Sequence, residues 1–293
     1  MALEEQLRTL GVWYFTDGMA VGQASELAPR LEQLGYSALW LPDTVGRDPF
    51  SHIAHLARDT EKLIFATGIA SIFHRHPGPM KQVANTLADQ TGGRFVLGLG
   101  VSHAPMVAGL RKLDYSKPLT QMREYLAAMD EAPYGAFPPA APPKRLLAAL
   151  GPKMLELSRD AADGAHPYWT TPEHTAQARA ILGPDKALCV EQKLVLTDDA
   201  DAARATIVGA LSVYVTLPNY RNNWLRLGFT DDEIDGHDPR FLDAVVAWGT
   251  RDAIQARITA HLDAGADHVC IQVLTPGHPF RPDERALEAL APG

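Results

Sequence analysis

The sequence predicts an α/β fold, a (β/α)8 TIM barrel with extra helices inserted before the last strand. Short, nearly continuous apolar runs alternate with segments whose apolar residues recur at helical spacing. This alternation is typical of parallel strands that helices cover on their outer face. The chain is 293 residues long, which is enough for one barrel-sized domain, and we expect a single domain over residues 1–293.

The clearest strand–helix–strand unit spans residues 63–103. Its strands are expected at Leu63–Ile69 and Arg94–Leu99. The helix between them follows from four apolar residues at helical spacing, Met80, Val83, Ala84 and Leu87. Small and polar residues follow both strands directly. Because ligands gather at the carboxyl ends of parallel strands, we expect the chemistry in these two loops.

The remaining elements continue the same alternation. The other expected strands are Leu10–Phe15, Ala38–Leu41, Arg145–Leu150, Gly164–Tyr168, Leu188–Leu196 and His268–Leu274. Caps, early prolines and terminal glycines predict helices from Ser25 to Gly35, Pro49–Asp59, Leu119–Asp130, Pro152–Ala162, Thr171 to Gly183 and Thr250 to Gly265. Between residues 197 and 267 the pattern is helical throughout, with additional helices at Asp198–Val215, Pro218–Leu227 and Phe241–Trp248. The proline-rich loop at residues 133–143 is expected to be either a lid or a spacer.

The composition excludes several classes of function. The net charge is −8 and Lys and Arg form no long run, so we expect no nucleic-acid partner. Cys189 and Cys270 lie in apolar runs, where a thiol behaves as a small buried hydrophobe, which fits a reducing cytoplasm. The amino-terminal residues lack a signal pattern and no apolar run is long enough for a membrane span. We therefore expect a soluble, cytoplasmic protein without a membrane partner. The histidine pairs lack a third ligand at a recognisable spacing, so no metal site is expected.

Motifs at the ends of the expected elements point to one family. They are LGYSALWLPD at 34–43, TGI at 67–69, RHP at 75–77, GGRFVLGLG at 92–100, ALGPKM at 149–154, DGAHP at 163–167 and LDAGADH at 262–268. Together and in this order they resemble the luciferase-like family of flavin and deazaflavin oxidoreductases, over essentially the whole chain. The chain is most similar to the subgroup that uses the deazaflavin coenzyme F420 instead of FMN. The resemblance implies a cofactor across the barrel mouth, a small-molecule substrate and, as one possible assembly, a homodimer.

The resemblance also implies a set of cofactor contacts. Those to the ring are assigned to Asp43, Ile69, Ala70, Ser71 and His103, those to the phosphate arm to Gly151, Lys153, Gly164 and Ala165, and His166 joins the cofactor site. Physical chemistry supports the phosphate end, because Gly151 allows close backbone approach and Pro152 begins a helix whose free N–H groups attract an anion. An ordinary helix start is the alternative there. The family often has a non-proline cis peptide behind the ring, expected here within Gly68–Ser71, and a plain strand end is the alternative.

Candidate acid–base residues lie near the same strand ends. Asp43 is placed to accept a hydrogen bond from the ring or the substrate, or only to cap the next helix. Some relatives carry a histidine immediately after this acid, whereas this chain carries Thr44. The candidates for proton transfer therefore widen to four histidines, because an imidazole titrates near neutrality: His74, His76, His103 and His166. His74 and His76 are expected to border the substrate.

Two further positions in the expected barrel carry open alternatives. Glu191 lies in an apolar strand, so it is either an inward-facing site residue or a salt-bridged strut. Trp13 and Tyr14 alternate on the first strand, so one of them should face the barrel interior or its mouth, where it either walls the pocket or packs in the core.

These observations favour an F420-dependent oxidoreductase that transfers hydride between the deazaflavin ring and a small organic substrate. The first alternative is an FMN-dependent monooxygenase of the same family. The second is a non-catalytic protein that binds a flavin or deazaflavin. This alternative stays open because the chain carries Thr44 where some relatives carry a histidine. The third is an ordinary barrel enzyme that acts on a phosphorylated metabolite.

Overall fold

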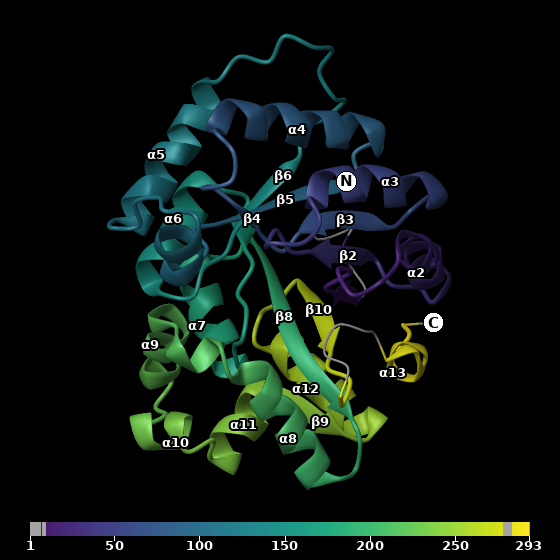
Figure 1. Ribbon diagram of the computed structural model, residues 1–293, viewed down its shortest axis with the longest axis vertical. Helices are drawn as coiled ribbons and strands as arrows, with labels where there is room; N and C mark the ends of the chain where they lie inside the picture. Colours follow the sequence, from purple (N-terminus) through teal and green to yellow (C-terminus); the bar gives the residue numbers. More distant parts are fainter. Residues whose placement is uncertain (1–6, 8–9, 278–282, 293) are drawn as a thin grey trace.

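The apolar runs form parallel strands that close into a barrel (Figure 1). The computed structural model describes residue 7 and residues 10–277 and 283–292. The barrel strands are β1 (Gly11–Trp13), β2 (Ala38–Leu41), β3 (Ile64–Thr67), β5 (Phe95–Gly100), β6 (Lys144–Leu147), β7 (Gly164–Ala165), β8 (Ala187–Leu196) and β10 (His268–Val273). Strand β10 pairs with both β1 and β8, which closes the ring. The predicted (β/α)8 barrel is confirmed.

Helices surround these strands. They are α2 (Val21–Gln33), α3 (Pro49–Leu56), α4 (Pro77–Gln90), α5 (Pro118–Glu131), α6 (Pro152–Ala161), α7 (Pro172–Leu182), α12 (Arg251–Asp263) and α13 (Glu284–Ala289), with the short turn η1 (Ala57–Asp59) after α3. The side chain of Asp48 caps α3 and that of Thr171 caps α7, each just before a proline. A cap satisfies an otherwise unpaired N–H, and proline at the first position has none to satisfy. Gly35 and Gly265 follow α2 and α12 with φ of 84° and 100°, a conformation that glycine adopts without strain.

One predicted helix start is wrong. Helix α2 begins at Val21 instead of at Ser25. The Ser25 hydroxyl donates to the Val21 carbonyl at 2.9 Å, inside the helix. The Gln23 side chain accepts the N–H of Ala20 at 3.0 Å, so a glutamine rather than a serine satisfies the helix start.

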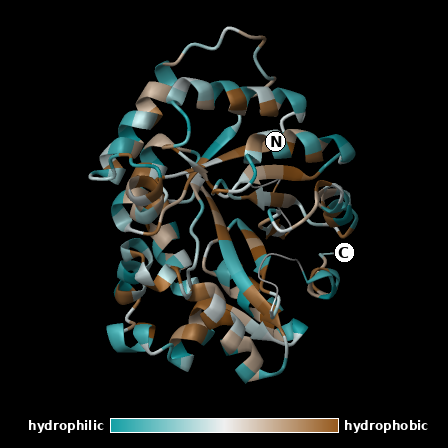
Figure 2. Cartoon of the chain, viewed as in Figure 1, coloured by the Kyte–Doolittle hydropathy of each residue, from teal (hydrophilic) through white to brown (hydrophobic). Residues whose placement is uncertain are grey.

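The core has two layers. Trp13 and Trp40 fill the barrel interior, and Cys189 and Cys270 lie beside them, buried as predicted. A second apolar layer packs between the strands and the outer helices. In Figure 2 the strands are largely brown, whereas β8 turns teal over part of its length. That part of the strand carries Glu191–Lys193.

Two glycines allow neighbouring strands to approach. A Cβ atom on Gly98 would lie 1.9 Å from the Thr67 carbonyl oxygen, and one on Gly164 would lie 2.0 Å from that of Ala187. Any side chain at either position would push strands apart, since such contacts are far below van der Waals distance.

The insert before β10 contains a strand that the sequence pattern did not predict. It comprises α8 (Ala200–Leu211), η3 (Tyr214–Thr216), α9 (Pro218–Arg226), α10 (Asp231–Asp235), α11 (Pro239–Val245) and β9 (Val246–Gly249). The helices predicted at Asp198–Val215 and Phe241–Trp248 therefore end early, at Leu211 and Val245. Lys193 and Leu194 of β8 pair with both β9 and β10, so β9 occupies the edge of β8 that β7 uses only at Ala187–Leu188. Residues 246–249 therefore form a strand in spite of their local helical pattern, because they pair with this otherwise free edge of β8.

Two other connections differ from expectation. The strand predicted at Leu63–Ile69 stops at Thr67, and after a cis peptide bond between Gly68 and Ile69 the chain forms β4 (Ala70–Ser71). The cis bond lies within the predicted range. After β5 the chain forms η2, a π-helical turn at Pro105–Leu110, which was not predicted.

The proline-rich loop is a spacer. It joins α5 to β6 and arches over α4 in Figure 1. Lys81 of α4 donates to the carbonyls of Asp130 and Ala132, at 2.9 and 2.6 Å, where the loop begins. None of the loop residues lines the pocket described below.

Among the described residues, the helices are all too short or too polar to cross a membrane.

Candidate active site

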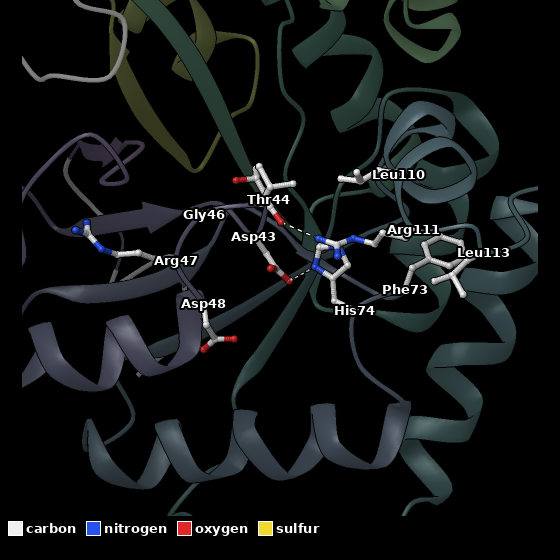
Figure 3. A pocket seen from close by; sticks show the side chains of 11 residues that line it. Asp43, Thr44, Gly46, Arg47, Asp48, Phe73, His74, Leu110, Arg111 and Leu113 are labelled. Carbon is white, nitrogen blue, oxygen red and sulfur yellow. Dashed lines mark hydrogen bonds and ion pairs between the residues drawn. The ribbon is translucent and has the colours of Figure 1, made fainter.

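A cavity opens where β2 and β4 end (Figure 3). Its volume is about 670 Å³, within the range of small-molecule sites. The loops after β2, β4 and β5 line it with Asp43, Thr44, Val45, Gly46, Arg47, Asp48, Phe73, His74, Leu110, Arg111 and Leu113. The carboxyl ends of the strands therefore hold the pocket, as the barrel fold predicts.

Asp43 lies at the centre of a polar cluster at this pocket. Its Oδ2 atom lies 2.9 Å from Nδ1 of His74 and 3.0 Å from Nη1 of Arg75. The same oxygen accepts the backbone N–H of Ser71 at 3.3 Å, and the N–H of Asp43 donates to the Ile69 carbonyl at 3.2 Å. Asp48 rather than Asp43 caps the next helix, so the capping alternative for Asp43 is wrong.

His74 reaches Asp43 from a different loop. Thr44 follows Asp43 in the sequence, but a histidine that follows β4 contacts the acid in space. The side chains of Asp43 and His74 are only 7% and 10% exposed, and Figure 3 shows the contact. A carboxylate on Nδ1 favours the tautomer that carries its proton there, which leaves Nε2 as the second site for a proton.

Arg75 holds the polar cluster around Asp43 in place. It also pairs with Asp48, and its guanidinium lies 4.5 Å from the centroid of the Phe50 ring. The Tyr125 hydroxyl donates to the Arg75 carbonyl at 2.9 Å. These contacts fix the segment that carries His74 relative to Asp43.

The structure brings none of the other three histidines to Asp43. His76 is exposed and caps α4, accepting the N–H of Gly78 at 3.3 Å. His103 lies 5.4 Å from the Tyr220 ring centroid; burial lowers its pKa, which a hydrogen bond with Asn219 opposes. His166 stacks on Trp40 inside the barrel, with 4.4 Å between ring centroids, and its Nδ1 lies 2.8 Å from the Cys189 carbonyl oxygen. Burial lowers the pKa of His166 to about 4, so its imidazole is neutral at pH 7.

The segment expected behind the cofactor ring is tied to both the pocket and the barrel interior. Ile69 and Ser71 hold Asp43 through their backbone, and Ala70 is fully buried in β4. Trp13 is the residue of the first strand that faces the interior, and its Nε1 donates to the Gly68 carbonyl at 2.9 Å. This hydrogen bond ties the segment to the barrel interior.

The residues predicted for the phosphate arm fall into two groups. Gly151 precedes α6, whose first turn has no side-chain cap, and Lys153 is exposed on that turn. Gly164 and Ala165 are instead buried in the barrel wall, where β7 pairs with β6 and β8. The start of α6 therefore offers the backbone N–H of Lys153 to an anion, because Pro152 has none and those of Met154 and Leu155 donate to the Gly151 carbonyl. Strand β7 supplies close strand packing.

Sequence reasoning missed a cation at the same helix start. A Cβ atom on Gly151 would lie 3.7 Å from Nη2 of Arg226, at the end of α9. Arg226 donates to the Asn223 side chain at 3.2 Å, and among the described residues it makes no ion pair. Nothing in the local sequence distinguishes Arg226 from an ordinary surface arginine, because only the insert brings it to α6.

The second missed residue is Lys193, the partner of Glu191 in an ion pair inside the barrel. Glu191 and Lys193 face inward from β8 with 2.9 Å between Oε1 and Nζ. The Lys193 ammonium lies 3.4 and 4.1 Å from the ring centroids of Tyr168 and Trp169. Burial lowers the pKa of Lys193 and raises that of Glu191, and the ion pair opposes both shifts. Glu191 is thus both inward-facing and salt-bridged.

The third missed residue is Arg111 in the loop after η2. Its Nη2 donates to the Thr44 carbonyl at 2.9 Å, and it lines the pocket beside His74 (Figure 3). Among the described residues, His, Cys, Asp and Glu form no group of three placed to hold a metal ion.

Known proteins share this sequence pattern and this barrel. Residues 7–268 match the family model of the luciferase-like monooxygenases. A 5,10-methylenetetrahydromethanopterin reductase of Methanolobus tindarius is 25% identical over 321 aligned positions, which cover 94% of this chain and 96% of that protein.

Two solved structures share the fold. The coenzyme F420 dependent tetrahydromethanopterin reductase of Methanopyrus kandleri superposes with a TM-score of 0.74 and 18% identity, over 97% of each chain. The oxygenating constituent of 3,6-diketocamphane monooxygenase of Pseudomonas putida, solved with FMN, gives 0.72 and 15%, also over 97% of each chain. The family match extends over most of the chain, so the predicted luciferase-like oxidoreductase is confirmed: the chain belongs to the luciferase-like monooxygenase family.

Proposed function

We propose that this enzyme is an F420-dependent oxidoreductase that transfers hydride between the deazaflavin ring and a small organic substrate. The observation that carries the proposal is the Asp43–His74 pair, which lines a pocket of about 670 Å³ at the carboxyl ends of the strands. The family assignment supports a redox role for this pocket. The relative and the neighbour named for methanopterin reduction favour F420 over FMN.

The start of α6 fits the phosphate of such a cofactor. Its first turn lacks a side-chain cap, Gly151 leaves room for close approach, and Lys153 and Arg226 supply positive charge. Helix N-termini attract anions through their free N–H groups and their dipole. Burial lowers the pKa of the Arg226 guanidinium, which an anion would counteract.

The chain supplies positioning and a proton, while the bound cofactor supplies hydride transfer. Asp43 accepts the Nδ1 proton of His74 and so orients the imidazole. Nε2 of His74 is then the atom that gives a proton to the substrate or takes one from it. Arg75 balances the charge of Asp43, and Phe73, Leu110 and Leu113 keep water from the reacting face.

A fluorescence titration of the purified protein with oxidised F420, and separately with FMN, tests the proposal. We expect tight binding of F420, weakened at least tenfold by Gly151→Glu, whose carboxylate would compete for the α6 terminus. A Cβ at Gly151 makes only an ordinary contact, so the variant should fold. The matched control is Gly135→Glu, in the loop before β6, where a Cβ meets no atom within 4 Å. Binding of neither cofactor would refute the proposal.

An FMN-dependent monooxygenase is the second candidate. The Pseudomonas putida enzyme, which was solved with FMN, has the same barrel, and this favours FMN as the alternative cofactor. Preferential binding of FMN, together with oxygen uptake by the reduced complex in the presence of substrate, would establish it. The third possibility, binding without turnover, is disfavoured by the Asp43–His74 pair, because a protein that only stores a cofactor needs no oriented imidazole in its pocket.

A further inference from the structure

We propose that the substrate of this pocket is an organic anion with an apolar body, and that Arg111 binds its anionic oxygens. The inference rests on the proposed function, because it names the substrate class of the same site. Three observations carry it: an arginine whose donors are only partly used, a lining whose other charged side chains already have partners, and an exposed apolar rim.

The donors of Arg111 are only partly satisfied. Nη2 donates to the Thr44 carbonyl, whereas Nε is buried without a hydrogen-bond partner among the described residues. No ion pair in the described part of the chain includes Arg111. A buried donor without a partner is costly, and an arginine offers two parallel donors to a carboxylate or phosphoryl group. Because Nε is enclosed by protein, a ligand anion would accept from Nη1, which makes no hydrogen bond among the described residues, and from the second N–H of Nη2.

The other charges of the lining are already engaged. Asp43 and Asp48 share Arg75. Arg47 donates both terminal nitrogens to the carbonyls of Thr16 and Met19, and Figure 3 shows it turned away from His74. Arg111 is therefore the cation of this lining that is left for a ligand. A guanidinium that lines a pocket and makes no ion pair favours an anionic ligand.

The rest of the rim is apolar. Val45, Leu110 and Leu113 are 67%, 58% and 44% exposed, and they are three of the eight large hydrophobic side chains that are exposed in the described chain. All three line this pocket, together with the half-buried Phe73. Exposed apolar side chains that gather at one cavity indicate an apolar ligand surface. The ligand should therefore combine an apolar body with one anionic group.

The anion has two conceivable sources, the substrate and the acidic groups of the cofactor. The cofactor phosphate is assigned above to the start of α6, which leaves Arg111 for the substrate. The two sources predict different effects of Arg111→Met. If the anion belongs to the substrate, loss of the cation should weaken the binding of substrate anions alone. If it belongs to the cofactor, the loss should weaken the binding of F420.

Calorimetric titration with 4-phenylbutyrate and its neutral analogue 4-phenylbutan-1-ol tests the assignment, on the protein with and without F420. We expect the carboxylate to bind at least tenfold tighter than the alcohol, and Arg111→Met to remove that preference. Phenyl phosphate tests whether a phosphoryl group serves equally. The matched control is Lys112→Met, which removes an exposed cation of the same loop and should keep the preference.

Several outcomes would overturn the inference. They are equal binding of acid and alcohol by the wild type, a preference that survives Arg111→Met, or no binding of either probe. Weaker F420 binding by Arg111→Met, with the acid unaffected, would assign the anion to the cofactor instead. A thermal melt of each variant confirms folding. Failure of the proposed function is separate, because it appears as absent F420 binding by the wild type while the probe titrations still report on Arg111.

Discussion

Two carboxylates of the barrel, each paired with a nitrogen-bearing side chain, differ in their access to a ligand. Asp43 and His74 line a cavity, and each keeps a small exposed fraction, 7% and 10%. Glu191 and Lys193 are 0% and 2% exposed, and the rings of Tyr168 and Trp169 cover the ammonium. The open pair is therefore our candidate for proton exchange with a ligand, whereas the sealed pair has to balance its own buried charges.

The largest effect is expected at the sealed pair. Lys193→Met leaves the Glu191 carboxylate buried without its cation, so the free energy of unfolding should fall by about 3–5 kcal/mol. The double variant Glu191→Leu/Lys193→Met should recover most of this loss, since a well-packed apolar pair can replace a buried ion pair. Urea unfolding measures both. A double variant as unstable as the single one would show that the pair has a role beyond charge balance.

The open pair should affect catalysis instead of stability. His74→Ala removes the group that exchanges the proton, and kcat should fall by about 100-fold, within the range of general acid–base catalysis. The dissociation constant for F420 should change less than about twofold, because Asp43 remains held by Arg75 and Ser71. The rate is followed through F420 absorbance with a substrate that the wild type turns over. His55→Gln, on the exposed face of α3, is the control. Unchanged kcat in His74→Ala would remove His74 from the mechanism.

A third prediction concerns acid stability inside the sealed part of the barrel. Burial lowers the pKa of His166 to about 4, whereas an unfolded histidine titrates near 6.5. Between these values the unfolded chain binds a proton that the folded chain does not, so stability falls as the pH drops from 6.5 towards 4.

The variant His166→Asn should reduce this acid sensitivity. Asparagine keeps a donor for the Cys189 carbonyl and does not titrate. The loss of unfolding free energy between pH 7 and pH 5 should be smaller than in the wild type by about 2 kcal/mol. Urea unfolding at the two pH values measures the difference. Parallel pH profiles of wild type and variant would show that His166 is not responsible.

The smallest effect is expected for an ion pair on the surface. Lys144 and Asp163 lie 3.1 Å apart with 52% and 39% of their side chains exposed. Lys144→Met should change the free energy of unfolding by less than about 1 kcal/mol, because water screens an exposed pair. A loss comparable to that of Lys193→Met would contradict the view that burial separates these pairs.

Much of the fold was predictable because its signals are local. The apolar runs, the Thr171 cap and the terminal glycines each act within a few residues. The same patterns placed Asp43, Ser71 and His74 at strand ends, which a parallel barrel brings to one rim. Strand β9 was not predictable, because Val246–Gly249 continues a helical pattern locally and forms a strand only where an edge of β8 is free.

The candidate site was predictable only in part, for the same reason. Of the proposed histidines, the structure brings His74 to Asp43, while His76, His103 and His166 have other surroundings. Arg226 and Arg111 escaped notice because nothing in their local sequence marks either one as a site residue. Their relation to Gly151 and Thr44 arises from chain segments far apart in sequence.

The sequence by itself determined the barrel, its family and the loops that hold the candidate site, because periodicity and strand-end motifs are properties of neighbouring residues. The tertiary structure decided which charges meet. It joined His74 to Asp43, buried Lys193 against Glu191, and left Arg111 facing the pocket without a carboxylate among the described residues. An electrostatic partner depends on distance and burial in space, and neither quantity is written in the order of residues along the chain.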